Sequence, residues 1–257
     1  MKHLAQSTFL LIIMGIILLP GNSTQAQELS AKEILKKAED NWQGEESSVG
    51  SMTMKIVREK WNRTITMKNW IKGRDYALTL IQSPAKEKGQ TFLKRGNEMW
   101  QWMPNINRMI KIPPSMMSQG WMGSDYTNDD ILKESSIVVD YTHKILGEEQ
   151  VDDYNCYKIE LTPKENAAVV WGKVIKWISK EDFMQMKSEY YDEYGDLART
   201  EIASEVQRMD GRNIPTHMEV IPNNKENQKT IIILNSMKFN QNIPDSFFSQ
   251  QNMKRVR

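Results

Sequence analysis

The sequence is poor in the residues from which catalytic and metal sites are usually built. It has one cysteine, Cys156, and three histidines among 257 residues. One cysteine excludes an intrachain disulfide, and its strand-like, aromatic surroundings favour a small buried residue over a nucleophile. His143 and His217 lack zinc-binding spacing, and the chain has neither a Gly-x-Ser-x-Gly turn nor a phosphate-binding Gly-Lys-Ser/Thr loop. We therefore expect no catalytic residue, no metal, no cofactor and no enzyme activity.

An excess of charge is also missing. The chain carries 34 basic and 33 acidic residues, a formal net charge of +1. A protein that binds nucleic acid needs a basic face. This balance gives no support for a nucleic-acid partner.

No apolar run is long enough to cross a membrane as a helix. The longest, residues 9–19, has 11 residues, against the roughly 20 that a spanning helix needs. Lys2 and His3 precede it, and the small residues Thr24 and Ala26 occupy the −3 and −1 positions of a cleavage site. This pattern predicts a secretory signal peptide over residues 1–26 and one exported domain over residues 27–257. An uncleaved membrane anchor is the rival interpretation.

Periodicity predicts a protein dominated by β-strands. Ser30 followed by Glu33 forms a capping box, which predicts one helix over residues 30–42. From residue 49 onward, apolar residues alternate with polar ones between short turns. This pattern is typical of an antiparallel meander, and we expect about 10–11 strands in one strongly curved sheet. A single helix cannot cover such a sheet, so either the sheet curls on itself or an apolar cavity remains.

Residues 98–132 form the most unusual stretch. They begin as strands, with Trp100 and Trp102 on one face, and then become a loop after the consecutive prolines 113 and 114. The loop carries large apolar residues among serines and glycines: Met116, Met117, Trp121 and Met122. Such a segment either packs onto a core or covers an apolar site that accepts variable shapes.

Three aspartates follow that loop. Asp125, Asp129 and Asp130 could hold a calcium ion in a loop, but capping of a short helical turn near residue 128 explains them more simply.

The order of several motifs resembles one protein family. The motifs are Trp100, Trp102 and Pro104 leading through Arg108 to Gly120, Gly123, Ser124 and Asp125, then Asp129 and Asp130, residues 157–161 and 190–192, Pro215 before Met218, and residues 239–248. Together they resemble the outer-membrane lipoprotein-sorting proteins, the LolA-like family, over essentially the whole mature chain. The nearest resemblance is to the long-loop bacterial branch that is associated with transporters of the resistance-nodulation-division (RND) type.

The resemblance implies a fold and a function. It implies an unclosed half-barrel with a lid across its open side, in the periplasm, with acyl chains between sheet and lid and no catalysis. It implies a carrier that takes a lipoprotein or other membrane lipid from an inner-membrane transporter of RND or ABC type towards an outer-membrane acceptor. Familiar carriers of the family use a strand arginine to hold the lid, and the sequence does not identify which of Arg58, Arg63, Arg74 and Arg95 would do so here. The cargo is therefore either lipoprotein acyl chains or another membrane lipid.

The methionines and tryptophans of the strands provide the candidate site. We expect the cavity to be lined by alternating strand residues: Met54, Met67, Trp70, Trp100, Trp102 and Met109. We expect the lid to be formed by residues of the helix and the loop: Ile34, Leu35, Met116, Met117, Trp121 and Met122. An ordinary packed core would give the same alternation.

Two other functions stay open at this point. A periplasmic adaptor of an RND-type transporter that carries no lipid would have a filled core and an exposed Trp121. A hydrolase would need a compact Ser or Asp constellation facing a polar cleft.

Overall fold

The computed structural model describes residues 28–256 except 45, 97, 134–135 and 168. The predicted signal peptide lies outside the described residues. Within them, no helix combines the length and the apolar character that crossing a membrane requires.

The predicted N-terminal helix is confirmed as α1 (Ala31–Gln43). The Ser30 hydroxyl accepts from the Glu33 backbone N–H, and the Glu33 carboxylate accepts from the Ser30 backbone N–H, so both halves of the capping box are formed. Gly44, with φ of 83°, ends the helix. The helix buries Ile34, Leu35 and Ala38 against the sheet.

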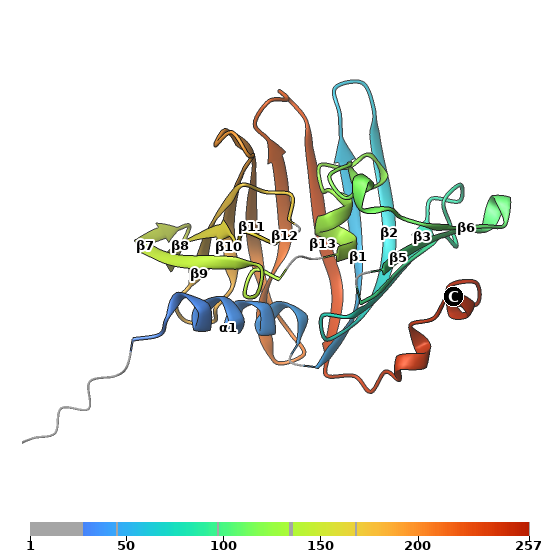
Figure 1. Cartoon of the computed structure of the whole chain (residues 1–257), viewed down its shortest axis with the longest axis horizontal. Helices are drawn as coiled ribbons and strands as arrows, with labels where there is room; N and C mark the ends of the chain where they lie inside the picture. Colours follow the sequence, from blue (N-terminus) through green and yellow to red (C-terminus); the bar gives the residue numbers. More distant parts are fainter. Residues whose placement is uncertain (1–27, 45, 97, 134–135, 168, 257) are drawn as a thin grey trace, which may run out of the picture.

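One antiparallel sheet of thirteen strands makes up most of the molecule (Figure 1). The strands are β1 (Ser47–Val57), β2 (Asn62–Lys72), β3 (Tyr76–Ser83), β4 (Thr91–Arg95), β5 (Glu98–Met103), β6 (Arg108–Lys111), β7 (Tyr141–Val151), β8 (Tyr154–Pro163), β9 (Lys173–Ser179), β10 (Gln185–Tyr191), β11 (Leu197–Met209), β12 (Arg212–Pro222) and β13 (Lys229–Phe239). The described residues thus contain more strands than the 10–11 expected, and even the short segments β4 and β6 are paired. The predicted single curved sheet is confirmed.

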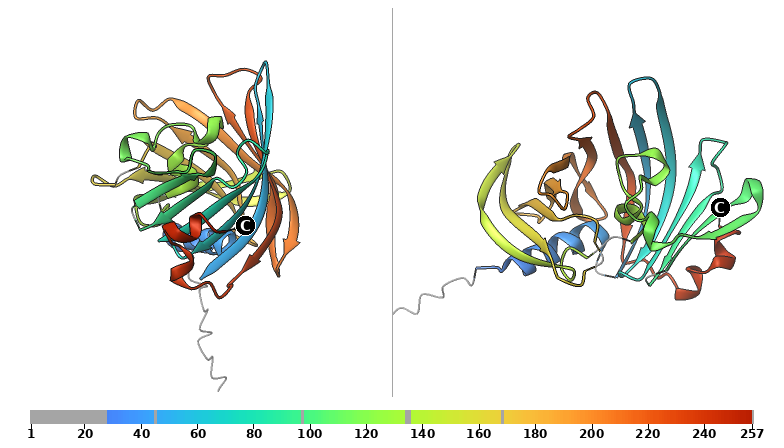
Figure 2. Two further views of the ribbon diagram at one scale, coloured as in Figure 1. Left: turned by 90° about the vertical axis from the view of Figure 1, so that its right-hand side faces the viewer. Right: turned by 45° about the horizontal axis from the view of Figure 1, so that its top comes forward.

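The strand order explains why a segment must cross the open side of the sheet. The order is β6-β5-β4-β3-β2-β1-β13-β12-β11-β10-β9-β8-β7, so two meanders meet where β1 pairs with β13. The chain leaves one edge of the sheet at β6 and enters the opposite edge at β7. Residues 112–140 connect these edges; we name them the crossover segment. Figure 2 shows this segment and α1 inside the curve of the sheet, on its concave face.

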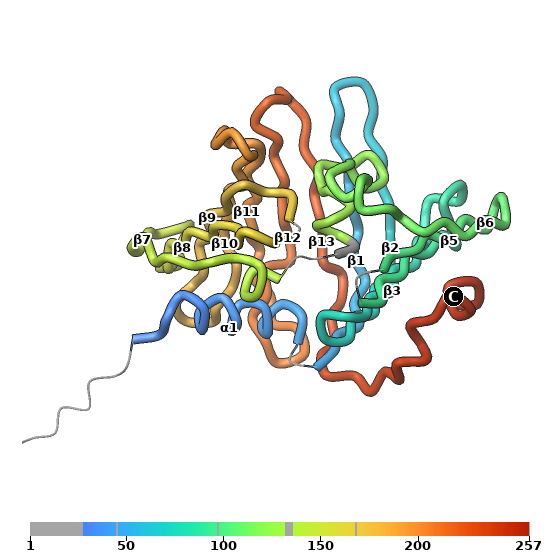
Figure 3. The backbone as a smooth tube through the Cα atoms, in the orientation of Figure 1, coloured from blue at the N-terminus to red at the C-terminus, as the bar shows by residue number. Residues whose placement is uncertain are grey.

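In its described residues, the crossover segment forms the short helical turns η2 (Pro114–Met116), η3 (Trp121–Gly123) and η4 (Asp129–Lys133). A further turn, η1 (Pro104–Ile106), joins β5 to β6. At the other end of the chain, η5 (Asp245–Phe247) and α2 (Gln250–Met253) lie outside the curve, against the outer face of β2–β5 (Figure 3).

Candidate functional site: a cavity beneath a latched lid

A cavity of about 280 Å³ lies between α1, the crossover segment and the concave face of the sheet. Its apolar wall comes from widely separated elements: Trp42, Met52, Met67, Ile131, Met218 and Ile232. The volume is just below the range of about 300–1,000 Å³ that is usual for small-molecule sites. Three of these six side chains are methionines, whose flexible thioethers adapt to ligands of different shape.

Beside the cavity, the crossover segment packs tightly on the sheet. We name residues 113–131 the lid. Trp121 is 1% exposed, and its ring meets that of Phe92 edge-on at 5.2 Å between centroids. Met117 and Met54 belong to the same buried cluster. The lid therefore fills one part of the concave face with its own side chains and leaves the cavity open next to it.

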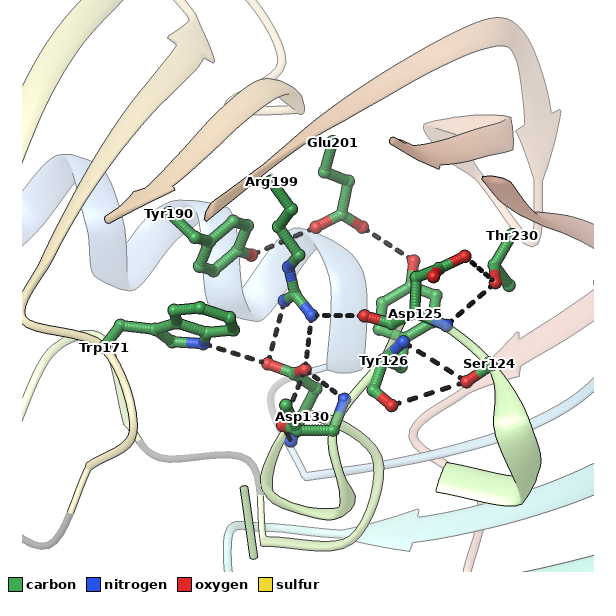
Figure 4. A network of polar contacts seen from close by, with 10 residues as sticks. Ser124, Asp125, Tyr126, Asp130, Trp171, Tyr190, Arg199, Glu201 and Thr230 are labelled. Carbon is green, nitrogen blue, oxygen red and sulfur yellow. Dashed lines mark hydrogen bonds and ion pairs between the residues drawn. The ribbon is translucent and has the colours of Figure 1, made fainter. Parts of the chain in front are cut away.

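Arg199 of β11 holds the C-terminal part of the lid (Figure 4). Its guanidinium donates to both carboxylate oxygens of Asp130, at 2.6 and 2.9 Å, and to the backbone oxygen of Asp125 at 2.9 Å. The guanidinium carbon lies 4.1 Å from the Tyr190 ring centroid and 4.7 Å from that of Trp171. A buried bidentate ion pair between aromatic rings fixes one orientation of the lid.

Arg58, at the end of β1, holds the other part of the lid. It donates to both carboxylate oxygens of Asp125, at 2.9 and 3.1 Å, and to the backbone oxygen of Gly123 at 2.9 Å. The hydroxyl of Thr230 donates to the same carboxylate at 2.7 Å. Arg63 of β2 donates to the backbone oxygen of Met122 at 2.8 Å. Three arginines, two on strands and Arg58 just after β1, thus bind the lid, and two of the three do so through a carboxylate.

Glu201 connects the lid to the cavity wall. Its two oxygens accept from the hydroxyls of Tyr126, at 2.9 Å, and Tyr190, at 3.0 Å (Figure 4). Burial and the neighbouring Glu201 carboxylate raise the pKa of both tyrosines well above the usual value. Both hydroxyls therefore remain protonated donors at neutral pH.

The ionisation of Asp130 depends on its partners. Burial alone would raise the pKa of this carboxyl, but the charge and hydrogen bonds of Arg199 and the hydrogen bonds from Thr127 lower it on balance. Burial acts against the charge of Arg199 as well, but Asp130, together with Tyr190 and Glu201, more than offsets it, so the pKa of the arginine is raised. The pair is therefore fully charged at neutral pH.

The predicted capping role of the aspartates is met in part. Thr127 and Asp130 form reciprocal bonds at the start of η4, with the Thr127 backbone N–H donating to the carboxylate at 2.6 Å and the Asp130 N–H donating to the hydroxyl at 3.1 Å. The arginine pairs of Asp125 and Asp130 were not anticipated. Among the described residues, no group of three His, Cys, Asp or Glu side chains is placed to hold a metal ion.

The structure divides the six predicted cavity residues between the two faces of the sheet. Met67 lines the cavity, and Met54 lies beneath Met117 and Trp121. The other four form a different cluster on the outer face: Trp70, Trp100, Trp102 and Met109. These four therefore do not line the cavity between the sheet, α1 and the lid, where they were expected from the sequence. In β2, Met67 and Trp70 are three positions apart, and residues an odd number of positions apart point to opposite faces.

The predicted lid residues also differ in role. Met117 and Trp121 are buried against the sheet, Met122 packs partly on the same cluster, and Met116 is 37% exposed. Ile34 and Leu35 pack on β8 and β9, in a separate cluster. The part of α1 that lines the cavity is instead its C-terminal half: Ala38, Glu39, Asn41, Trp42 and Gln43.

The contact between Arg199 and the lid was not predicted, because only arginines of the first half of the chain were considered for it: Arg58, Arg63, Arg74 and Arg95. A signal was present. Arg199, Glu201 and Ala203 alternate along one predicted strand, which places an arginine and a glutamate on the same face as an inward-facing alanine. Two charged residues on an inward face indicate a buried polar network.

One family model matches most of the chain. A family model described as "Uncharacterized protein" matches residues 73–255, or 183 of 257 positions. No protein in the curated set matches the chain.

Solved structures with the same architecture are similar over most of the chain. A LolA superfamily protein from Nitrosomonas europaea has a TM-score of 0.75 and 24% identity, covering 88% of this chain and all of its own. A DUF1329 family protein from Desulfovibrio piger has a TM-score of 0.77 and 25% identity, covering 87% of this chain and 98% of its own. A putative outer membrane lipoprotein-sorting protein domain from Vibrio parahaemolyticus has a TM-score of 0.74 and 20% identity, covering 88% of this chain and all of its own. The fold is therefore LolA-like.

Proposed function

The chain belongs to the family whose model matches residues 73–255, and it has the LolA-like fold. From this premise, we propose that the protein is a periplasmic carrier of acylated lipid. The observation that carries this proposal is the apolar cavity beneath a lid that charged and polar groups hold in place. In this proposal the acyl chain occupies the cavity, and the lid excludes water from it.

The size of the cavity indicates how loading would proceed. At about 280 Å³ it is small for a lipid with several chains. Trp121 and Met117 fill the adjoining part of the concave face, so withdrawing the lid would join their space to the cavity. We propose that cargo enters as the lid opens and displaces these side chains.

The energetics suit reversible transport. Each buried CH₂ group contributes about 0.8 kcal/mol, so roughly ten of them would contribute about 8 kcal/mol before the entropic costs of binding. Opening the lid breaks hydrogen bonds and ion pairs that water can replace, together with the apolar contacts of Met117, Trp121 and Tyr126. Such a lid can close on cargo and still release it to a partner.

The cargo and the partners follow from the same proposal. The cargo is a lipoprotein or another membrane lipid, the donor is an inner-membrane transporter of RND or ABC type, and the acceptor lies at the outer membrane. The adaptor hypothesis required a filled core and an exposed Trp121. Trp121 is buried and a cavity remains beside it, so these observations favour the carrier.

Native mass spectrometry of protein purified from the periplasm, followed by organic extraction, tests the proposal. We expect a mass excess that matches an acylated lipid. Ala203 lines the cavity, whereas the preceding residue, Ile202, is on the outer face and 37% exposed. Ala203→Phe should therefore abolish the mass excess, and Ile202→Phe should retain it.

Thermal unfolding of both variants separates loss of cargo from loss of fold. A wild-type protein that stays cargo-free after incubation with phospholipid and acylated peptide would refute the carrier, and so would a folded Ala203→Phe protein with unchanged cargo.

A further inference from the structure

We propose that the tip of the β1–β2 hairpin, residues 58–62, is a docking element for an anionic membrane surface, and that Arg58 couples this docking to the lid. The docking itself is independent of the proposed function. The coupling to the lid rests on the proposed function, because the coupling concerns how the cargo site opens.

The hairpin tip exposes a large aromatic side chain. Trp61 is 48% exposed. The turn that carries it is closed by a 3.0 Å hydrogen bond from the Arg58 backbone N–H to the Trp61 backbone oxygen. Figure 1 shows the β1–β2 hairpin extending beyond the lid at the upper end of the molecule. Tryptophan favours the interface between water and lipid because its ring is apolar and its N–H is polar.

The charges around Trp61 favour an anionic surface once the lid contact of Arg58 opens. Residues 58–63 contain Arg58, Lys60 and Arg63 against one acidic residue, Glu59. In the closed state Arg58 is paired with Asp125 and Arg63 lies 3.9 Å from Glu87, so an anionic bilayer meets Lys60 first and gains the charge of Arg58 when its pair with Asp125 breaks.

A second turn provides a contrast within the same chain. Tyr194, between β10 and β11, is more exposed than Trp61, at 83%. Its neighbours are the acidic residues Asp192, Glu193 and Asp196. An anionic bilayer would repel this turn and attract the one that carries Trp61.

Arg58 belongs to both the tip and the lid. Its guanidinium carbon lies 5.8 Å from the Trp61 ring centroid, while the same guanidinium binds Asp125 and Gly123 of the lid. Lipid phosphate is a strong bidentate acceptor for arginine and would compete with the Asp125 carboxylate once Trp61 lies in the interface. Docking would therefore weaken the contact between Arg58 and the lid where the membrane can supply or accept cargo.

Sedimentation with vesicles tests the docking. The probes are vesicles of phosphatidylcholine with phosphatidylglycerol and vesicles of phosphatidylcholine alone, each mixed with protein freed of cargo. We expect binding to the anionic vesicles, a loss of about tenfold in affinity for Trp61→Ala, and no change for the matched control Tyr194→Ala. Equal affinity of Trp61→Ala and the wild type would overturn the docking.

The same variants separate this inference from the carrier function. Trp61 is outside the cavity lining, so Trp61→Ala should still carry lipid in native mass spectrometry. A protein that carries cargo but ignores vesicles would refute the docking alone. A requirement for a membrane protein in the vesicles would instead assign Trp61 to a protein partner and overturn the proposal.

Hydrogen exchange tests the coupling. Within the lid, the backbone N–H of Trp121 donates to the backbone oxygen of Tyr126 at 2.7 Å. The backbone N–H of Asn128 donates to the backbone oxygen of Gln119 at 2.8 Å. We expect anionic vesicles to accelerate exchange of these amides in the wild type and not in Trp61→Ala. Unchanged exchange in wild-type protein that is bound to vesicles would refute the coupling.

Discussion

Both faces of the sheet carry large apolar residues, with methionine prominent on the concave face and tryptophan on the outer face, yet they are covered in different ways. On the outer face, Trp70 and Trp102 are buried under the C-terminal segment, where Phe248 is fully buried and stacks on Tyr76 at 5.3 Å. On the concave face, the lid is held mainly by arginines, aspartates and a glutamate, and a cavity remains beside it.

We propose that this difference separates a closed core from a cavity that can open. The outer cover is held by aromatic packing, which water cannot replace, so we expect it to stay closed. The inner cover combines the packing of Trp121 with hydrogen bonds and ion pairs that exchange with water at small net cost, so we expect it to open more readily. Apolar strand faces alone do not decide between the two outcomes; the chemistry of the covering segment does.

The largest effect should come from the outer face. Phe248→Ala removes a fully buried ring and should lower the free energy of unfolding by about 3–5 kcal/mol, measured by chemical denaturation. The folded fraction should keep its affinity for lipid, because Phe248 does not line the cavity. Loss of lipid affinity without loss of stability would contradict the division into a permanent and an opening cover.

A somewhat smaller effect is expected at Arg199. Arg199→Ala leaves the Asp130 carboxylate buried without its guanidinium and should cost about 3 kcal/mol of stability. Hydrogen exchange in residues 117–130 should rise more than in β2–β5. Lys158→Ala, which removes a surface pair with Glu149, is the control and should cost less than about 1 kcal/mol. Equal exchange in the lid of Arg199→Ala and the wild type would show that the Arg199–Asp130 pair does not hold the lid closed.

Acid should affect the inner cover through Asp130. Its pKa in the folded protein is lowered below the ordinary 3.8, so its contribution to stability is present above that value and is lost as the pH falls through the folded pKa. Lid exchange, corrected for intrinsic rates, should stay flat from neutral pH down to about 4 and then rise. Asp130→Asn should remove the part of this rise that is due to Asp130; a rise near pH 6 in the wild type would point to another group.

The smallest effect is expected at Tyr126. Tyr126→Phe removes the hydroxyl that donates to Glu201 and should cost about 1 kcal/mol, because Tyr190 still donates to the other oxygen. Lipid release should become faster, with little change in the melting temperature. Tyr191→Phe, whose hydroxyl bonds Glu189 instead, is the matched control.

Local signals predicted much of the fold. The capping box at Ser30 placed α1, and alternation with short turns indicated one antiparallel sheet, because these patterns depend on neighbouring residues. The apolar loop after the paired prolines was predicted either to pack on a core or to cover an apolar site, and Trp121 lies buried in the cluster on the concave face, beside the cavity.

The candidate site was less predictable, since it depends on contacts between distant residues. Trp70 and Trp102 look like ligand-binding residues in sequence, and only the position of Phe248 shows that they belong to a packed face. Arg199 meets Asp130 across 69 positions, and no local pattern pairs them.

The pairing of β1 with β13 has a consequence for how the protein forms. Ser48 pairs with Phe239, so the centre of the sheet closes only when residues 191 positions apart meet. The cost in entropy of closing so long a loop makes this step slow. Until β13 is in place, each meander exposes an unpaired edge. The lid bonds to Arg199 of β11 and to Thr230 of β13, so it can close only on a sheet that is already complete.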